Sequence, residues 1–176
     1  SSLATVLVST GYLNRFNIHR GEYYALTLFA AIGMILMAQA NDLVMIFLGL
    51  ELMSLCLYVL AGMKRGDVRS QEAGLKYLLI GAISAALFLF GASLVYMVCG
   101  TTMLKDLTAT VPLHLKDPLL LFGVVFMIAG MGFKVAAAPF HMWAPDVYEG
   151  GPTAMVAFAS VASKGAGFVL MIRLLL

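Results

Sequence analysis

The sequence predicts an all-α fold: a polytopic bundle of transmembrane helices with five spans, one of which is discontinuous. Hydrophobic residues make up 62% of the 176 positions and charged residues 11%, whereas soluble domains are about half apolar and a quarter charged. The mean hydropathy is +0.97. Apolar segments of about the 20 residues that a helix needs to cross a bilayer recur along the chain. We therefore expect an integral membrane protein.

The first three spans are predicted at residues 23–40, 43–63 and 72–99. The first of these segments carries no charge. The second carries one charged residue, Glu51, and the third has Lys76 near its start. Uncharged runs of this length are typical of helices inside the hydrocarbon layer.

The last two spans have clear start signals. The fourth begins at Pro118, because Asp117 followed by proline is a favourable N-cap and first-turn pair. The fifth begins at Pro152 and carries Lys164 midway. The chain lacks a start methionine and ends on three leucines. We expect residues 1–176 to be a single membrane-domain fragment of a larger polytopic chain.

Cations are unevenly divided between the two sides of the predicted bundle. One side holds six and the other three: Arg15, Arg20, Lys64, Arg65, Arg69 and Lys76 against Lys105, Lys116 and Arg173. Loops rich in Lys and Arg stay in the cytoplasm or its organelle equivalent. This rule places the loop at 99–117 outside and the turn at 146–151 inside.

Several kinds of site are not expected in this chain. Cys56 and Cys99 stand 43 positions apart without a CxxC or Cys/His cluster, so no metal site is predicted. The net charge of +2 is small and dispersed, which argues against nucleic-acid binding. No cofactor-binding motif was identified.

Three charged residues lie inside the predicted membrane segments: Glu51, Lys134 and Lys164. Glu51 is nine residues past Asp42 and Lys164 is twelve past Pro152, so each lies roughly 13 to 18 Å deep at ~1.5 Å per residue. Three unpaired charges at this depth would cost roughly 8 to 10 kcal/mol. These side chains must therefore face the protein interior or water.

Two interpretations of these charges remain open. Glu51 and one lysine could form a fixed ion pair that only locks helices together. A buried pair is often no more stable than apolar residues of equal volume, however, and two lysines here compete for one carboxylate. The favoured interpretation is a proton path, because a buried lysine can exist neutral and an adjacent carboxylate favours its charged form. Glu51, Lys134 and Lys164 are the predicted proton-carrying residues.

The stretch GFKVAAAPFHMWAPDVYEG, residues 132–150, predicts the break in the fourth span. Pro139 removes a backbone donor and clashes with the carbonyl four residues earlier. The helix should end just after Lys134 and restart around His141. Broken helices of this kind build ion sites in transporters, and the freed carbonyls should lie beside the Lys134 ammonium. A kink that only shapes packing is the alternative.

Five further residues have a less central predicted role, and for three of them two interpretations remain open. His141 could relay protons or only satisfy the freed backbone. Lys76 could extend its ammonium to the headgroups or belong to the line of charges. Trp143 and Tyr148 are predicted anchors at the membrane interface. Asp146 is predicted to be solvated or to cap the second half-helix.

Four stretches together resemble the subunit N family of bacterial NADH-quinone oxidoreductase, respiratory complex I, whose members are antiporter-like membrane subunits. They are GLELMSLCLYVLAG (49–62), EAGLKYLLIGAIS (72–84), GFKVAAAPFHMWAPDVYEG (132–150) and ASKGAGF (162–168). The resemblance covers nearly the whole chain. Lysine followed by PFHxWxPDVYEG is its most specific part.

The resemblance implies one of two inverted five-helix repeats, preceded by the end of another span in residues 1–12. It assigns Glu51 to the carboxylate of the second repeat helix and Lys134 to its partner at the break. Lys164 matches the central lysine, and Lys76 a less central position. Protons would enter from the cytoplasmic side, pass along these residues and leave on the far side, driven by quinone reduction elsewhere in the complex.

The resemblance also implies the surroundings of the chain. It would be a subunit of a translocating NADH:quinone oxidoreductase with no redox chemistry of its own. NADH, FMN, iron–sulfur clusters and quinone would bind other subunits. Its partners would be the other membrane subunits of complex I, the lipid bilayer and protons, in a bacterial cytoplasmic (inner) membrane.

Two alternatives belong to other classes. Related subunits occur in multisubunit sodium/proton antiporters and membrane-bound hydrogenases, but they differ in the PDVYEG segment and in the span after residue 152. A non-transporting membrane scaffold is the second alternative.

Overall fold

The computed structural model describes residues 2–15 and 21–175, and over these residues it consists of helices and their connections. The side chain of Arg15 and the whole of Arg20, which entered the orientation prediction, lie outside the described part. In chain order the elements are α1 (Ser2–Arg15), α2 (Gly21–Gln39), α3 (Leu43–Ala61), α4 (Val68–Cys99), α5 (Leu104–Thr110), the 3-10 turn η1 (Val111–His114), α6 (Pro118–Val135), α7 (Trp143–Gly150), α8 (Thr153–Phe158), the π-helical turn η2 (Ala159–Ser163) and α9 (Lys164–Leu175).

Five helical segments of the described chain are long and apolar enough to cross a membrane. They are α2, α3, α4, α6 and the continuous run from α8 through η2 to α9. The all-α fold with five spans is thus confirmed. α4 begins at Val68, four residues before the predicted start of its span, because Asp67 accepts a hydrogen bond from the Arg69 N–H and caps the helix.

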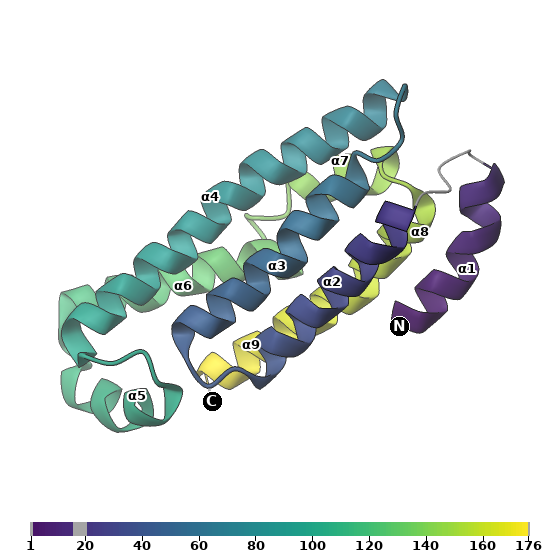
Figure 1. Cartoon of the computed structure of the whole chain (residues 1–176). Coiled ribbons are helices and arrows are strands. Elements are labelled where there is room, and N and C mark those ends of the chain that lie inside the picture. Colours follow the sequence, from purple (N-terminus) through teal and green to yellow (C-terminus); the bar gives the residue numbers. More distant parts are fainter. Residues whose placement is uncertain (1, 16–20, 176) are drawn as a thin grey trace.

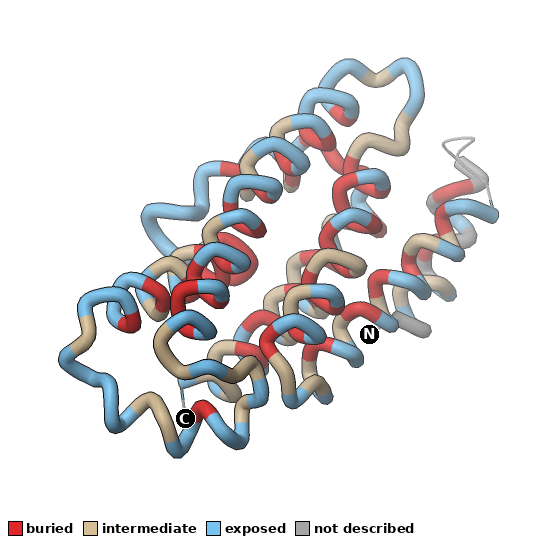
Figure 2. The backbone as a smooth tube through the Cα atoms, turned by 60° about the vertical axis from the view of Figure 1, so that its left-hand side comes forward, coloured by how far each residue is buried: buried red, intermediate tan, exposed pale blue. Residues whose placement is uncertain are grey.

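The spans lie roughly side by side along one long direction (Figure 1). α4 packs along α6, and α2 packs along α3 and α9. The α2–α3 turn and α5 lie at one end of the bundle, and the α3–α4 connection and α7 lie at the other (Figure 1). Buried residues face the neighbouring helices, whereas the outward sides are exposed (Figure 2).

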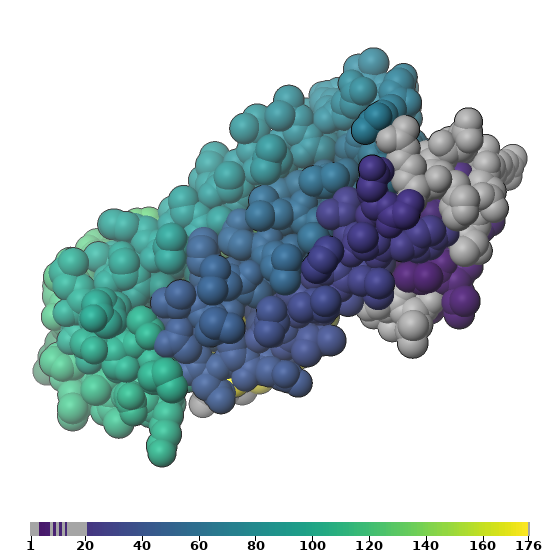
Figure 3. All heavy atoms as spheres, in the orientation of Figure 1, coloured from purple at the N-terminus to yellow at the C-terminus, as the bar shows by residue number. Residues whose placement is uncertain are grey.

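One face of the bundle is formed by α4, α3 and α2 in order (Figure 3). Large apolar side chains on these helices are exposed: Leu28, Ile32, Ile35, Leu48, Leu55, Val59, Leu79 and Ile83. A soluble protein rarely exposes contiguous apolar area of this kind, whereas a transmembrane bundle presents it to lipid or to neighbouring membrane helices.

Glycine pairs set the distance between the long helices. A Cβ on Gly49 of α3 would lie 2.7 Å from the Met37 nitrogen and 2.9 Å from the Gly33 oxygen of α2. Gly91 of α4 and Gly123 of α6 make the same kind of contact, with a Cβ on Gly91 only 2.5 Å from the Gly123 oxygen. Small residues let membrane helices approach until their backbones touch.

The end of the bundle that holds α5 is tied together by backbone and side-chain bonds. The Leu43 N–H donates to the Thr102 carbonyl and the Leu104 N–H to the Asn41 carbonyl, both at 2.9 Å. The Thr102 hydroxyl donates to the Asp42 carboxylate. This bond, together with the backbone N–H groups that Asp42 caps, holds the pKa of Asp42 below its ordinary value although burial acts in the opposite direction.

We expect Thr102→Val to loosen this end of the bundle in a pH-dependent way. Because the pKa of Asp42 is lowered in the folded state, its contribution is present above the ordinary value of about 3.9 and is lost as the pH falls further. Amide exchange at Leu43 and Leu104 should be several-fold faster in the variant at neutral pH. The difference should shrink below the ordinary pKa and vanish only below the lowered pKa of Asp42, where the carboxyl is protonated in the folded state of both proteins.

The matched control is Thr108→Val in α5, because the Thr108 hydroxyl only bonds the Lys105 carbonyl within its own helix. Equal exchange rates in the Thr102 and Thr108 variants at neutral pH would contradict the role given to Thr102.

Candidate functional site

The fourth span is broken where the sequence predicts. α6 ends at Val135 and α7 begins at Trp143. Ala136 adopts a left-handed conformation with φ 56°, and its N–H turns back to the last helical carbonyls. The Ala137 N–H donates to the Gly132 carbonyl at 2.8 Å. The break is therefore a capped helix end of the Schellman type.

Trp143 is a core residue, so its predicted place at the membrane interface is wrong. It is 2% exposed, and its indole N–H donates to the Phe133 carbonyl at 3.0 Å. Its ring stacks on Tyr77 of α4 with centroids 4.5 Å apart. A buried indole N–H needs an acceptor, and the helix end supplies one. One interpretation of His141 was that it bonds the backbone groups freed by the break. Trp143 fills that role instead, through its bond to the Phe133 carbonyl.

Lys134 is buried between α6 and α3, 3% exposed. Its ammonium donates to the Ser54 hydroxyl oxygen at 2.5 Å and to the Tyr58 hydroxyl oxygen at 3.0 Å. It also lies 5.3 Å and 5.1 Å from the ring centroids of Tyr58 and Phe133. The expected contact with freed carbonyls is wrong, because those of Gly132 and Phe133 are bonded to backbone N–H groups and to Trp143.

Glu51 is half-buried on α3, three residues before Ser54. Its Oε1 atom is buried and has no hydrogen-bond partner. The charges of Glu51 and Lys134 interact through space. The ion pairs of the described residues nevertheless join other side chains, so the two groups are more than 4.0 Å apart. A fixed Glu51–Lys134 pair is not present in this structure.

Lys164 is the first residue of α9, directly after the π-helical turn η2. It is partly buried, and its ammonium lies 5.3 Å from the ring centroid of Tyr148. The Tyr148 hydroxyl is buried without a hydrogen-bond partner, so Tyr148 is no interface anchor. One turn further along, a Cβ on Gly167 would lie 3.7 Å from the Lys134 Cβ. The helix of Lys164 therefore packs directly against the helix end that carries Lys134.

Lys76 belongs to a charged cluster between α4 and α7. Its ammonium pairs with Glu72 at 2.8 Å and with Asp146 at 3.3 Å, and Arg69 pairs with Glu149 at 3.6 Å. Asp146 is exposed, as predicted, and in addition pairs with Lys76. The alternative that it caps α7 is wrong, since the N-cap of α7 is Met142.

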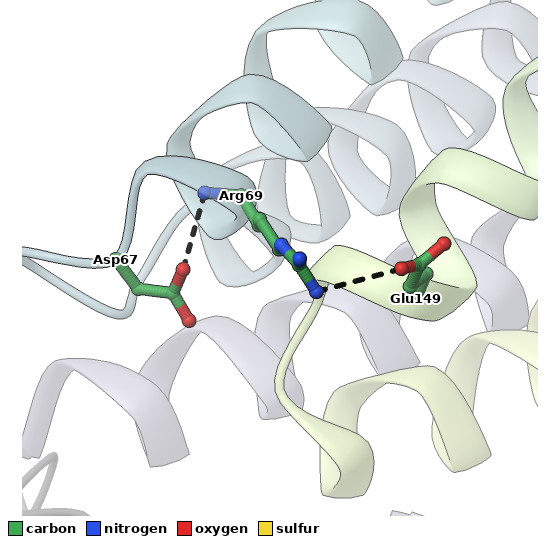
Figure 4. Close-up of polar contacts among 3 residues, drawn as sticks. All are labelled: Asp67, Arg69 and Glu149. Atoms are coloured by element: carbon green, nitrogen blue, oxygen red, sulfur yellow. Dashed lines mark hydrogen bonds and ion pairs between the residues drawn. The ribbon is translucent and has the colours of Figure 1, made fainter.

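These side chains line an open cavity of about 220 Å³. Figure 4 shows the Arg69–Glu149 arm of the cluster, with Asp67 accepting from the Arg69 backbone N–H. The cluster lies at the end of the bundle that the cation count assigns to the cytoplasm.

His141 lies exposed on the connection between α6 and α7. The residues that accept hydrogen bonds from Lys134 belong to α3 and do not include His141. The structure therefore places Lys134 on the face of α3 that carries Glu51, without an ion pair between them, and packs the helix of Lys164 against it. His141 lies outside this group.

Sequence reasoning missed Ser54 and Tyr58. The signal was present, because both follow Glu51 at spacings of three and seven residues and so share its face of α3. What the sequence could not show is that this face meets Lys134, which is 80 residues from Ser54 and 76 from Tyr58. Among the described residues, no three His, Cys, Asp or Glu side chains gather into a potential metal site.

Comparisons with known proteins identify the family of the chain. Residues 40–176 match the family model described as NADH:quinone oxidoreductase/Mrp antiporter, TM. The chain is 51% identical to NADH-quinone oxidoreductase subunit N 2 of Rhizobium meliloti, over all of this chain and 37% of that protein.

Two solved structures share the fold. A chain of respiratory complex I from Thermus thermophilus matches with 42% identity and a TM-score of 0.78, over 88% of this chain and 34% of that chain. A chain of the membrane-bound sulfane sulfur reductase, an archaeal respiratory membrane complex, matches with 25% identity and a TM-score of 0.79, over 87% of this chain and 31% of that chain.

The chain thus spans about a third of the length of the relatives it matches. The five apolar spans among its described residues and its family match make it a multi-pass membrane protein. On the strength of the match over residues 40–176, the chain belongs to the NADH:quinone oxidoreductase/Mrp antiporter transmembrane family.

Proposed function

We propose that this chain is one proton-conducting repeat of an antiporter-like subunit of NADH-quinone oxidoreductase. Protons move along Glu51, Lys134 and Lys164, and quinone reduction in other subunits drives the movement. The observation that carries the proposal is the state of Lys134. Its ammonium is buried among neutral groups while the nearest carboxylate, Glu51, has a buried oxygen with no partner.

An unpaired carboxylate beside a buried lysine is a poor structural lock. A buried ion pair stabilises a fold only when the two charges are in close contact. Separated charges in an apolar interior add the free-energy cost of desolvation without this compensation. Two groups that are able to pair or separate suit proton exchange, since a lysine releases its proton more readily when the carboxylate is away. The geometry therefore favours the switching interpretation over the fixed pair.

The cluster of Lys76, Glu72 and Asp146 supports proton uptake at its end of the bundle. Its cavity is open, and its lining includes carboxylates and the Lys76 ammonium, which can bind and release protons. We propose that it is the cytoplasmic mouth of the path, with Lys76 as an entrance group rather than a member of the central line. His141 is given no role, because it is exposed and outside the Lys134 contacts.

The wider setting is also part of the proposal. NADH, FMN, iron–sulfur clusters and quinone bind other subunits, and this chain contributes no redox chemistry. Its partners are the other membrane subunits of the complex and the lipid of a bacterial inner membrane. The unit formed by α2 to α9 is one five-helix repeat, and α1 is the end of a preceding span.

Glu51→Ala tests the function. We expect the variant complex to assemble, but its NADH-driven proton uptake into inverted membrane vesicles should fall at least about tenfold, with linked quinone reduction also slower. Proton uptake is measured with a pH-sensitive dye. The control is Glu22→Ala, since Glu22 is exposed at the start of α2. Normal proton uptake by an assembled Glu51→Ala complex would refute the assignment.

A second candidate is supported by the description of the matching family, which also names Mrp antiporters. In that case the chain would serve sodium/proton exchange. Replacing sodium by potassium in the vesicle assay separates the two: undiminished NADH-driven proton uptake without sodium favours the oxidoreductase.

A further inference from the structure

The contacts of Lys134 define a second place for its ammonium besides Glu51. Glu51, Ser54 and Tyr58 lie on one face of α3 at helical spacings of three and four residues. Neighbours at these spacings have Cβ atoms roughly 5–6 Å apart. A lysine side chain that enters from α6 has four flexible carbons, so it can reach either the carboxylate or the hydroxyls by rotamer changes alone.

We propose that Ser54 and Tyr58 form a resting site that holds Lys134 away from Glu51 during the transfer cycle. This inference rests on the proposed proton translocation, and it assigns Ser54 and Tyr58 as positioning residues. The resting site is occupied in this structure, since Lys134 bonds both hydroxyls and has no ion pair with Glu51.

The chemistry of the resting site suits a group that must exchange its proton. A carboxylate only accepts hydrogen bonds, so it favours the ammonium form of lysine. A hydroxyl both accepts and donates. The Ser54 hydroxyl proton is used in a bond to the Leu50 carbonyl, so its oxygen accepts from Lys134. Tyr58 is able to accept from the ammonium or to donate to the neutral amine.

Both hydroxyls are held in place by their surroundings. Ser54 is fully buried and anchored to its own helix by the bond to Leu50. The Tyr58 hydroxyl lies directly against Gly81 of α4, where a Cβ would overlap it. The Tyr58 ring also packs edge-on against Tyr77, with centroids 4.7 Å apart. The resting site is thus a built feature of the α3–α4–α6 contact.

The titratable groups around Lys134 come from three elements. Glu51 and Tyr58 belong to α3, and Tyr77 of α4 lies behind Tyr58. Lys164 begins α9, which packs on Lys134 at Gly167. Removing the two hydroxyls frees Lys134 to pair with the Glu51 carboxylate, and an opposite charge nearby favours the ammonium, so Lys134 should keep its proton to a higher pH.

The test is the pH profile of NADH-driven proton uptake by the complex that carries Ser54→Ala and Tyr58→Phe together. We expect the alkaline limb to move to higher pH by about one unit or more, which is about tenfold in the proton equilibrium. Uptake at the acidic end should stay near that of the wild type. Each single variant should show a smaller shift in the same direction, and Ser54→Thr, which restores a hydroxyl, should reverse the effect of Ser54→Ala.

Matched controls separate positioning from packing. Ser84→Ala removes a buried hydroxyl that bonds the Gly130 carbonyl, and Tyr77→Phe removes a buried phenol beside Tyr58 that makes no hydrogen bond to Lys134. Both controls should keep the wild-type pH profile. An unchanged profile in the double variant, a uniform loss at every pH, or an equal shift in the controls would overturn the resting site.

Lys134→Met, measured in the same assay, distinguishes this failure from failure of the proposed function. If Lys134→Met takes up protons normally, the proton path itself is wrong. If Lys134→Met is inactive while the hydroxyl variants match the wild type, only the resting site is wrong. Should the double variant fail to assemble, the single variants and the threonine rescue decide the matter.

Discussion

Replacing Lys134 by methionine is expected to lower proton translocation roughly a hundredfold or more while leaving the complex assembled. Methionine has a similar length and flexibility, so it fills most of the space that the lysine stem occupies. Removing the buried charge relieves desolvation, and the Ser54 hydroxyl keeps its bond to the Leu50 carbonyl. The path, however, loses the group that receives and releases the proton.

The measurement is NADH-driven proton uptake per assembled complex in inverted vesicles, with assembly followed on native gels. Lys105→Met serves as the control, because Lys105 is exposed on α5 and far along the chain from the site. Wild-type proton uptake in the Lys134 variant would show that the buried lysine is structural. Loss of the assembled complex would instead show that its hydroxyl contacts hold α3 and α6 together.

Gly49→Val is expected to abolish most assembly rather than proton uptake per complex. A Cβ at Gly49 would lie 2.7 Å from the Met37 nitrogen and 2.9 Å from the Gly33 oxygen. These are backbone atoms, so no side-chain rotation relieves the overlap and α2 must move away from α3. Overpacking of this kind costs about 1–3 kcal/mol or more.

The abundance of assembled complex on native gels checks this prediction. Gly165→Val in α9 is the matched control, since nothing lies within 4 Å of a Cβ there. Both variants place the same β-branched residue in a helix, so propensity cancels in the comparison. Equal abundance of the Gly49 and Gly165 variants would mean that the α2–α3 backbone contact is dispensable.

The spans and the break were predictable because their causes are local. Asp117 and Pro118 start α6, and Pro139 lies in the connection that separates α6 from α7. Each signal acts within about a turn of its own position. The prediction that Glu51 and Lys134 face the protein interior was equally direct. Both lie within apolar segments long enough to span a bilayer, where contact of a charged side chain with lipid is costly.

The partners of these residues were predicted poorly because they come from distant elements. Trp143 was predicted to be an interface anchor. It lies in the core instead, where its ring stacks on Tyr77 of α4 and its indole N–H donates to a carbonyl at the end of α6. Asp146 is exposed, as predicted, but its ion pair with Lys76, 70 positions earlier, was not foreseen. Periodicity along one helix says nothing about which helix packs against it.

By itself the sequence determined that this chain is a bundle of membrane-spanning helices with one interrupted span and with ionisable groups held in an apolar interior. Those features follow from transfer free energies and backbone chemistry that act residue by residue. Only the tertiary structure decided that Lys134 meets Ser54 and Tyr58 instead of Glu51. The physical reason is that close backbone contacts at glycines fix how each helix is rotated, and that rotation selects which side chains face the buried lysine.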